Sequence, residues 1–376
     1  MNLYGVTDLN PLHTYFPIFP AKRGEFTALT KLQSEVRKHV MPIFEIPVGD
    51  WDKTSKEDFI NRKVETIEKL VEKTQLFSLA VDTYYYSKND QILENGRHVF
   101  EYIYNSLYQL DIRVIPIVGY DRWFNSFDST YRTTLSKMEF RDAPYFIIRL
   151  DGEALDDSDE PEYFLEQIEE ILHGIKATPQ QCVMLVDLKS IVKKSLPELI
   201  DKTQRIAKAL TQLTPLSIII SGSSVPETID KAVDEPDSCG LLLRKESLIW
   251  QNLIKIFPQI SFKYSDYGVK APSGKESVPA GDNANGKIRY TTDNHYYIAR
   301  GHKIAIDHNF SQMHTLAKKI VNSSYFEEDP SSWADNEIKK VSKHERTSGN
   351  HETWIAIDTN RHIQHILEEV SQKTFI

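Results

Sequence analysis

Charged residues recur where short apolar stretches of this 376-residue sequence end. Arg149 and Asp151 end one stretch, Asp187 and Lys189 end another, and Glu45 lies at the end of a third. Residues two apart in a strand point to the same side of a sheet, so each pair would present a cation beside a carboxylate. Such charges are costly to bury unless they are paired, and their repetition therefore needs a physical reason.

Two interpretations account for these charges. Under the first, they form a ring of structural ion pairs or are hydrated where the strands end. Under the second, they form an exposed polar site, in which carboxylates transfer protons and cationic groups bind phosphate or carboxylate oxygens. The candidate catalytic residues are then Glu45, Asp82, Asp151 and Asp187. The candidate ligand-binding residues are Lys22, Arg149, Lys189, Ser221, Gly222, Arg244 and Arg300.

Ser221 and Gly222 precede a pattern that is typical of a helix start. Ser224 and Glu227 have the spacing of a capping box, and Pro226 stands near the first helical position. Helix N-termini bind phosphate through their free backbone N–H groups, and barrels often bind phosphate at this point. An ordinary capped helix explains the pattern equally well. The pattern therefore predicts a helix, with or without an anion bound at its start.

Metal and cofactor sites have weaker support. His362 and His365 lie three residues apart with His351 nearby, but no HExxH pattern or cysteine accompanies them, which favours a surface or packing role. Cys182 and Cys239 begin apolar stretches and are interpreted as core residues. Cations interleaved with the acids would compete with a metal for them, so a metal-dependent hydrolase is disfavoured. No metal ligand is predicted, and the sequence identifies no cofactor.

Eight apolar stretches alternate with amphipathic helical stretches over the first two thirds of the chain. They cover residues 15–22, 40–47, 77–84, 113–121, 144–151, 182–189, 216–221 and 239–246. Helices are expected between them, for example over residues 58–73, 162–173 and 196–213. This alternation indicates a parallel sheet covered by crossover helices, and about eight units close into a (β/α)8 barrel with the charges at its mouth. An open doubly wound sheet is the alternative, although the Gly-rich turn of a dinucleotide-binding sheet is missing.

The remainder of the chain predicts a smaller α/β segment. Residues 269–286 are rich in Pro, Gly, Ser and Asn and are expected to form a linker or long loop. Residues 287–376 follow, with a predicted hairpin over 287–301, a helix over 310–321, a strand over 353–358 and a helix over 361–372. A segment of this size is expected to pack on the barrel, which would occupy residues 1–268. Arg300 could then reach the barrel mouth.

Composition restricts the classes of partner. The formal net charge of −9 disfavours general binding to duplex nucleic acid, which usually requires a basic surface. Neither a signal-peptide pattern nor an apolar run of bilayer length occurs, so the protein is expected in the cytoplasm and away from membranes.

Several short strings together resemble the Beta protein family, which is named for a component of a phage-satellite defence cassette. The strings follow the chain order as Lys22-x-Gly24-Glu25, Pro42-x-x-Glu45-x-Pro47, Arg149-x-Asp151, Arg244-x-Glu246 with Trp250, Ser265-Asp266-Tyr267-Gly268, Ile288-x-Tyr290-Thr291, Arg300-Gly301, Gly349-Asn350 with Trp354, and His362 with His365. The resemblance implies a phage-defence, antiviral context in which the protein restrains a toxic partner encoded beside it. It implies no catalytic residues.

Two functional hypotheses therefore stay open, and with them the question of whether the chain is an enzyme. The first is a defence-associated protein that neutralises a toxic protein partner from a neighbouring gene, or senses infection, through a charged pocket at the barrel mouth. The second is a hydrolase or phosphodiesterase-like enzyme that acts on an anionic phosphorylated small molecule or a nucleic-acid fragment. A concave mouth with converging charges would favour the enzyme, and a filled mouth would favour the binding scaffold.

Overall fold

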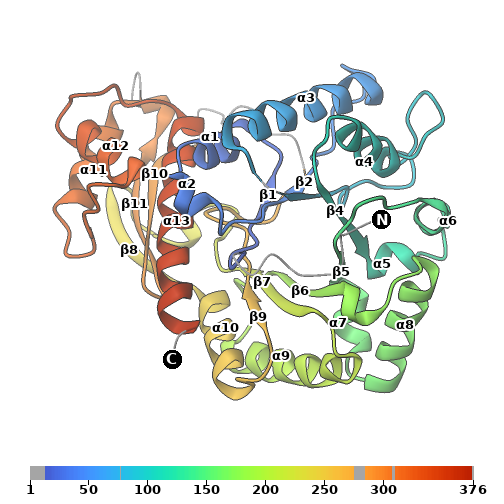
Figure 1. The fold of residues 1–376 in the computed structure, drawn as a ribbon. Helices are drawn as coiled ribbons and strands as arrows, with labels where there is room; N and C mark the ends of the chain where they lie inside the picture. Colours follow the sequence, from blue (N-terminus) through green and yellow to red (C-terminus); the bar gives the residue numbers. More distant parts are fainter. Residues whose placement is uncertain (1–12, 77, 275–283, 307–309, 375–376) are drawn as a thin grey trace.

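A computed structural model describes residues 13–76, 78–274, 284–306 and 310–374. Its main body is an α/β fold in which eight parallel strands form one curled sheet (Figure 1). In sheet order the strands are β1 (Ile18–Pro20), β2 (Ile43–Glu45), β3 (Leu79–Asp82), β4 (Val114–Gly119), β5 (Phe146–Leu150), β6 (Cys182–Ser190), β7 (Ser217–Ser223) and β9 (Phe262–Tyr264). Two backbone hydrogen bonds link the ends of the sheet, from Phe16 N to Tyr264 O (2.9 Å) and from Ile18 N to Asp266 O (2.8 Å).

The strands are apolar on both faces because both faces are buried. One set of side chains, including Ile43, Ile117 and Leu185, forms a compact cluster enclosed by the curled sheet. The alternate set, including Phe44, Ile148 and Val186, belongs to a larger cluster shared with the surrounding helices. This arrangement explains why the sequence shows continuous apolar runs instead of a polar–apolar alternation.

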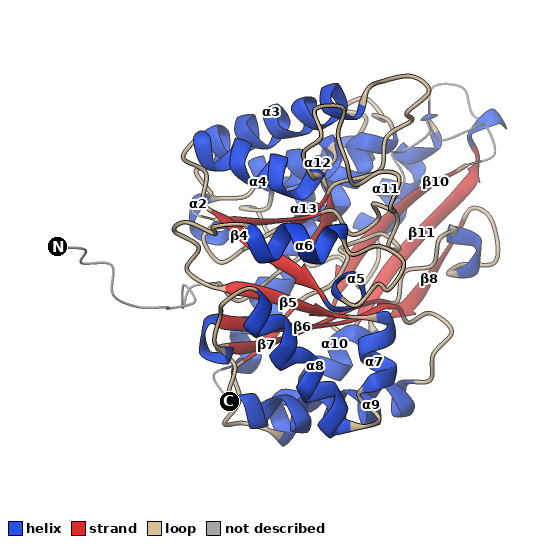
Figure 2. Ribbon diagram, turned by 90° about the vertical axis from the view of Figure 1, so that its right-hand side faces the viewer, coloured by secondary structure: helices blue, strands red, loops and turns tan. Residues whose placement is uncertain are grey.

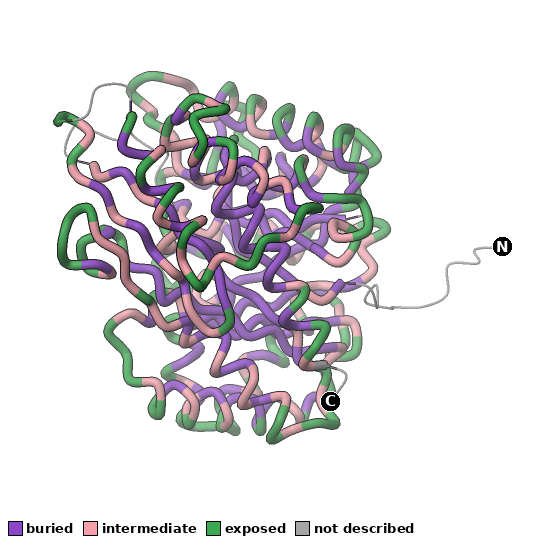
Figure 3. The backbone as a smooth tube through the Cα atoms, turned by 90° about the vertical axis from the view of Figure 1, so that its left-hand side faces the viewer, coloured by how far each residue is buried: buried purple, intermediate pink, exposed green. Residues whose placement is uncertain are grey.

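Helices surround the curled sheet and carry the chain from each strand to the next (Figure 1). They are α1 (Arg23–Thr30), α2 (Ser34–Arg37), α3 (Lys56–Thr74), α4 (Val99–Gln109), α5 (Tyr120–Trp123), α6 (Thr130–Lys137), α7 (Gly152–Asp157), α8 (Pro161–Gly174), α9 (Leu196–Leu210) and α10 (Lys245–Ile256). The predicted helices correspond to α3, α8 and α9. Figure 3 shows the buried backbone in the centre and the exposed outer turns of the helices around it.

The prediction for the eighth strand of the sheet was wrong. The apolar stretch at residues 239–246 supplies β8 (Ser238–Leu243), but β8 pairs antiparallel with β11 (His295–Lys303) in a separate three-stranded sheet. The eighth place in the curled sheet belongs to β9, which follows α10. An apolar run fits any buried strand, and its pairing partner is decided by distant segments that local periodicity does not reveal.

The small sheet and three helices make up the rest of the structure (Figure 2). The sheet has the order β10 (Asn285–Thr292), β11, β8, and the helices are α11 (Gln312–Val321), α12 (Trp333–Ser342) and α13 (His351–Thr374). The predicted strand at residues 353–358 was wrong, because these residues lie in α13. Asn350 caps this helix, since its Oδ1 accepts a hydrogen bond from Thr353 N (2.9 Å). Trp354 and Ile357 are buried at helical spacing.

Helix α13 packs against both parts of the structure. Asn360 Nδ2 donates to Ala28 O of α1 (3.0 Å). A Cβ atom at Gly24 would lie 2.8 Å from Ile355 Cγ2, so glycine permits the close approach of α1 and α13. Of the predicted loop over residues 269–286, residues 275–283 lie outside the described part of the chain. None of the described helices is both long and apolar enough to cross a membrane.

Candidate functional site

The carboxyl ends of the parallel strands bring four of the predicted site residues together, with Arg149 at the centre and Glu45, Asp82 and Asp187 around it. Its Nη1 donates to Asp82 Oδ2 (2.6 Å) and its Nη2 to Glu45 Oε1 (2.6 Å). Its Nε and Nη2 both donate to Asp187 Oδ2, at 3.0 and 2.6 Å. Tyr267 adds its hydroxyl, which accepts from Nη2 (2.9 Å) and donates to Asp187 Oδ2 (2.6 Å). We call these five residues the Arg149 cluster.

Register places these groups at one end of the sheet. Glu45 lies beside Asp82 across β2 and β3, and both are the last residues of their strands. Arg149 is the penultimate residue of β5, and Asp187 lies in β6. Because parallel strands all end at one edge, side chains far apart in sequence converge there.

Lys189 and Asp151 lie next to the Arg149 cluster. Lys189 Nζ is 3.1 Å from Asp187 Oδ2 and 3.6 Å from Asp151 Oδ2. It also lies 3.1 Å from the centre of the Tyr84 ring, while the Arg149 guanidinium lies 4.2 Å from the same ring. The Tyr84 ring therefore attracts both cations, which also share the Oδ2 oxygen of Asp187.

Burial and charge together decide the ionisation of these groups. Burial alone would raise the pKa of Asp187, but the Lys189 and Arg149 charges outweigh it and hold that pKa well below its usual value. Arg122 and Arg149 likewise outweigh burial at Asp82 and lower its pKa. Burial raises the pKa of Glu45, and the two nearby cations offset this only in part.

The charges of the Arg149 cluster are buried, whereas the site interpretation expected them to be exposed. The Arg149, Asp82 and Asp187 side chains have 0 % exposure, and that of Glu45 has 3 %. Tyr84 and Tyr267, which follow β3 and β9, lie against Arg149 at this end of the sheet. Together with Arg122 and Lys189, the Arg149 cluster therefore forms an ion network in which three cations offset three carboxylates.

The other predicted ligand-binding residues lie outside the Arg149 cluster. Lys22 is half-buried at the N-terminal cap position of α1. Ser221 and Gly222 are buried in β7, where Ser221 lies beside Asp187 in register. Arg244 Nη1 donates to Glu369 Oε2 of α13 (2.8 Å). Arg300 Nη1, on β11, donates to the main-chain oxygens of Val233 and Asp234.

Two members of the ion network were missed at the level of sequence. Arg122 Nη1 donates to Asp82 Oδ1 (2.6 Å), so Asp82 binds an arginine through each carboxylate oxygen. Tyr267 bridges Arg149 and Asp187. Both residues follow a strand, and this position is a signal that the sequence offers. Tyr267 was missed because a tyrosine side chain is not a charged group, and Arg122 because it lies beyond the end of its apolar stretch.

The capping box predicted for Ser224 and Glu227 was wrong. Ser224 instead binds Glu246, whose Oε2 accepts from Ser224 N (3.1 Å) and Ser224 Oγ (2.5 Å). Ser224 Oγ in turn accepts from Lys245 N (2.9 Å) at the start of α10. The serine thus caps a helix that is distant in sequence, which local spacing cannot reveal.

Glu246 makes the stability of the protein pH-dependent. Its complete burial raises its pKa from 4.5 to about 7, against the opposing charge of Arg244. The folded state therefore binds a proton that the unfolded state has released, and this stabilisation is lost as pH rises from about 4.5 to 7. Between pH 4.5 and 7 the wild type should therefore lose about 3 kcal/mol more of its free energy of unfolding than Glu246→Gln does. Urea unfolding at several pH values measures the difference.

The matched control is Glu227→Gln, because Glu227 is exposed. Its pH profile should follow that of the wild type. If Glu246→Gln and the wild type lost equal stability between pH 4.5 and 7, the assigned role of Glu246 would be incorrect.

A second buried network joins the curled sheet to the C-terminal segment. Asp266 accepts hydrogen bonds from Tyr15 Oη (2.5 Å) and Tyr264 Oη (3.0 Å), and it lies 2.8 Å from His362 Nε2. His362 Nδ1 lies 3.0 Å from Thr291 Oγ1 of β10. The packing role expected for His362 agrees with these contacts, and the described residues contain no group of three potential metal ligands.

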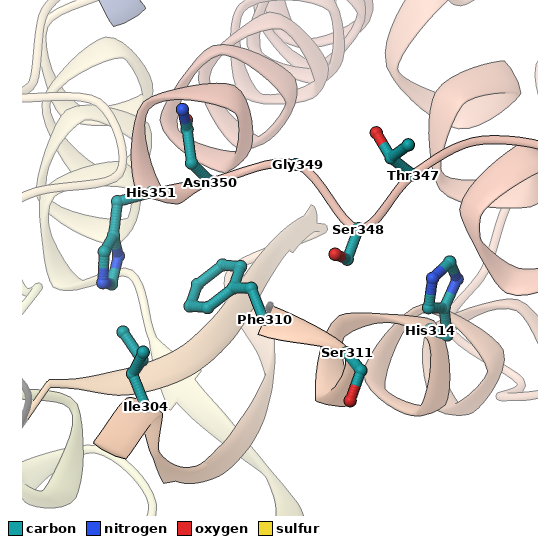
Figure 4. Close-up of a pocket in the computed structure, with 9 residues that line it drawn as sticks. All are labelled: Ile304, Phe310, Ser311, His314, Thr347, Ser348, Gly349, Asn350 and His351. Carbon is teal, nitrogen blue, oxygen red and sulfur yellow. The ribbon is translucent and has the colours of Figure 1, made fainter. Parts of the chain in front are cut away.

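One hollow among the described residues lies away from both networks, at the start of α11 and α13 (Figure 4). It has a volume of about 690 Å³, and Phe310 lies between His351 on one side and His314 on the other. None of the predicted site residues lines it. His314 Nδ1 already contacts Val341 O (2.7 Å), and Asn350 caps α13.

Comparison with known proteins adds one finding. A family model described as Beta protein matches residues 15–368, from the first strand segment into α13. None of the curated proteins compared with the chain matches it. The match therefore includes both the curled sheet and the C-terminal segment.

Proposed function

Because the chain belongs to the Beta protein family, we propose that it is a phage-defence protein that acts by binding and restraining a toxic protein encoded beside it. The curled sheet is then a rigid scaffold, and binding takes place on its surface. We also propose that the sheet is a complete (β/α)8 barrel. The backbone hydrogen bonds of Phe16 and Ile18 with the segment of β9 support this closure.

The strand-end charges bind one another within the protein, and this observation carries the proposal. Arg149 donates from all three of its guanidinium nitrogens to Asp82, Glu45, Asp187 and Tyr267. A guanidinium that binds an external anion would need two donors free and accessible. Arg149 has no exposed side-chain surface, so this group favours a structural role over substrate binding.

An enzyme that acts on an anionic phosphorylated small molecule or nucleic-acid fragment is the second candidate. The Lys189 side chain favours it, because 22 % of its surface is exposed whereas Arg149 has none. Asp151 lies 3.6 Å from the Lys189 ammonium and would be the proton-transfer partner. Under this alternative, Lys189→Met would abolish turnover and leave protein binding unchanged.

Native mass spectrometry of the protein, co-expressed with the products of its neighbouring genes, tests the proposal. We expect a complex of defined stoichiometry between this chain and one neighbour. We also expect Lys189→Met to form the same complex, because most of the Lys189 side chain is buried beside the Arg149 cluster. The protein should relieve the growth defect that the toxic partner causes when it is produced alone.

Two results would contradict the proposal. The first is the absence of a complex between this chain and any of the neighbouring gene products. The second is a bound small molecule that Lys189→Met removes, which would favour the enzyme.

A further inference from the structure

Strand β8 is an edge strand that lacks the usual protection against pairing with another chain. It ends the small sheet, and β11 is its pairing partner among the described residues. All six of its residues are at least partly exposed, whereas those of β2, β3 and β4 are all buried. Its sequence, Ser-Cys-Gly-Leu-Leu-Leu, contains no charge and no proline. Natural edge strands usually carry such residues because unpaired backbone groups and apolar side chains invite a further strand.

The direction of the backbone groups follows from the pairing of β8 with β11. Arg244 N donates to Asn294 O (2.8 Å), and Leu242 and Gly240 are paired with Tyr296 and Ile298. Successive residues of a strand direct their backbone groups to opposite sides. The N–H and C=O groups of Cys239, Leu241 and Leu243 therefore point away from β11, toward the free edge.

The two faces beside this edge differ in chemistry. On one face, Leu241 is paired with Tyr297, whose ring stacks on Tyr325 at 4.7 Å. Leu241 is 44 % exposed and Tyr325 is 38 % exposed, so this face offers an apolar surface. A strand added to β8 would place every second side chain against it.

The opposite face lies beside an acidic loop. A Cβ atom at Gly240 would lie 3.1 Å from Val233, so the chain before β8 covers this face. The loop that contains Val233 has five exposed acids and one exposed lysine: Glu227, Asp230, Asp234, Glu235, Asp237 and Lys231. The intervening side chains of an added strand would face this negative charge.

We infer that the free edge of β8 binds an extended segment of another protein in which apolar and basic residues alternate. Main-chain hydrogen bonds to Cys239, Leu241 and Leu243 would provide affinity, and the two faces would select the side chains. This inference rests on the proposed function, because it names the surface through which the chain binds its polypeptide partner.

A fluorescent ten-residue peptide of alternating lysine and valine is the direct probe, with fluorescence anisotropy as the measurement. Leu241→Pro removes one outward N–H group without removing a hydrogen bond to β11, and proline is tolerated at such edge positions. We expect it to weaken peptide binding at least tenfold. Leu241→Val keeps both the N–H group and an apolar side chain, and it should bind as the wild type does.

Three further arms make the test specific. An alternating glutamate–valine peptide should not bind. Replacement of Asp234 and Glu235 by their amides should weaken binding of the basic peptide and reduce its dependence on salt. Leu241→Lys replaces this test if Leu241→Pro does not fold. It keeps the N–H group but places a charge on the apolar face, and it should therefore weaken peptide binding.

The net charge of −9 attracts any basic peptide, so the comparison between Leu241→Pro and Leu241→Val is decisive. Equal binding by these two variants would overturn the inference. A wild-type homodimer that Leu241→Pro dissociates would also overturn it, because the edge would then pair with a second copy.

If a complex with a neighbouring gene product persists in Leu241→Pro, the inference fails while the proposed function stands. If no neighbour binds but the basic peptide requires Leu241, the proposed function fails and the edge remains a peptide-binding surface.

Discussion

Replacement of Arg149 by alanine is expected to lower the free energy of unfolding by about 3–5 kcal/mol, because it leaves buried carboxylates without their counter-charge. Arg149 has no exposed side-chain surface and contacts Glu45, Asp82 and Asp187 at 2.6 Å. Arg122 and Lys189 remain nearby, but neither can replace the hydrogen bonds that the Arg149 guanidinium makes to all three carboxylates. Urea unfolding followed by circular dichroism measures the loss. Arg149→Lys keeps the charge but not the fork of donors, so an intermediate loss is expected.

Arg132→Ala is the matched control. Arg132 contacts Glu170 at 2.8 Å, but 46 % and 42 % of the two side chains are exposed. Exposed pairs contribute about 0–1 kcal/mol, so this variant should unfold almost as the wild type does. Equal stability of Arg149→Ala and Arg132→Ala would show that the Arg149 cluster is hydrated, and the site interpretation would then regain support.

Replacement of Arg244 by alanine is expected to destabilise the contact between the curled sheet and α13. Arg244 has no exposed side-chain surface and pairs with Glu369 at 2.8 Å, and it also donates to Tyr264 Oη (3.1 Å). Loss of the arginine leaves Glu369 buried with Lys373 as its remaining cation, which costs about 3–5 kcal/mol. We also expect faster proteolytic cleavage within α13, measured by limited digestion and mass spectrometry.

A double-mutant cycle provides the sharper measurement. The Arg244→Ala and Glu369→Ala changes should together cost less than the sum of the two single changes, because each single change leaves an uncompensated charge. Arg205→Ala serves as a control, since Arg205 pairs with Asp159 and Asp201 at the surface. Strict additivity of Arg244→Ala and Glu369→Ala would contradict a direct energetic link between Arg244, at the start of α10, and Glu369 of α13.

Much of the curled sheet can be predicted from the sequence because each strand carries a local signal. Seven of the eight apolar stretches form strands of the curled sheet in chain order, and α3, α8 and α9 lie where their periodicity placed them. The convergence of Glu45, Asp82, Arg149 and Asp187 could also be predicted, since parallel strands end at one edge. Family membership was recognisable from short strings spread over most of the chain.

Tertiary structure alone decided which strands pair and which charges are buried. The leucines of β8 fit the curled sheet and the small sheet equally well, and only the position of β11 selects between them. The helix that Ser224 caps, α10, begins beyond an intervening strand, where the backbone N–H of Lys245 donates to Ser224 Oγ. Residues 353–358 join α13 because the helix buries Trp354 and Ile357 at its own spacing. Local pattern determines the type of many elements, whereas pairing, capping and burial depend on segments that meet only in the folded protein. The same limit applies to Arg149, whose residue type and position are plain in the sequence but whose enclosure by carboxylates is a property of the fold.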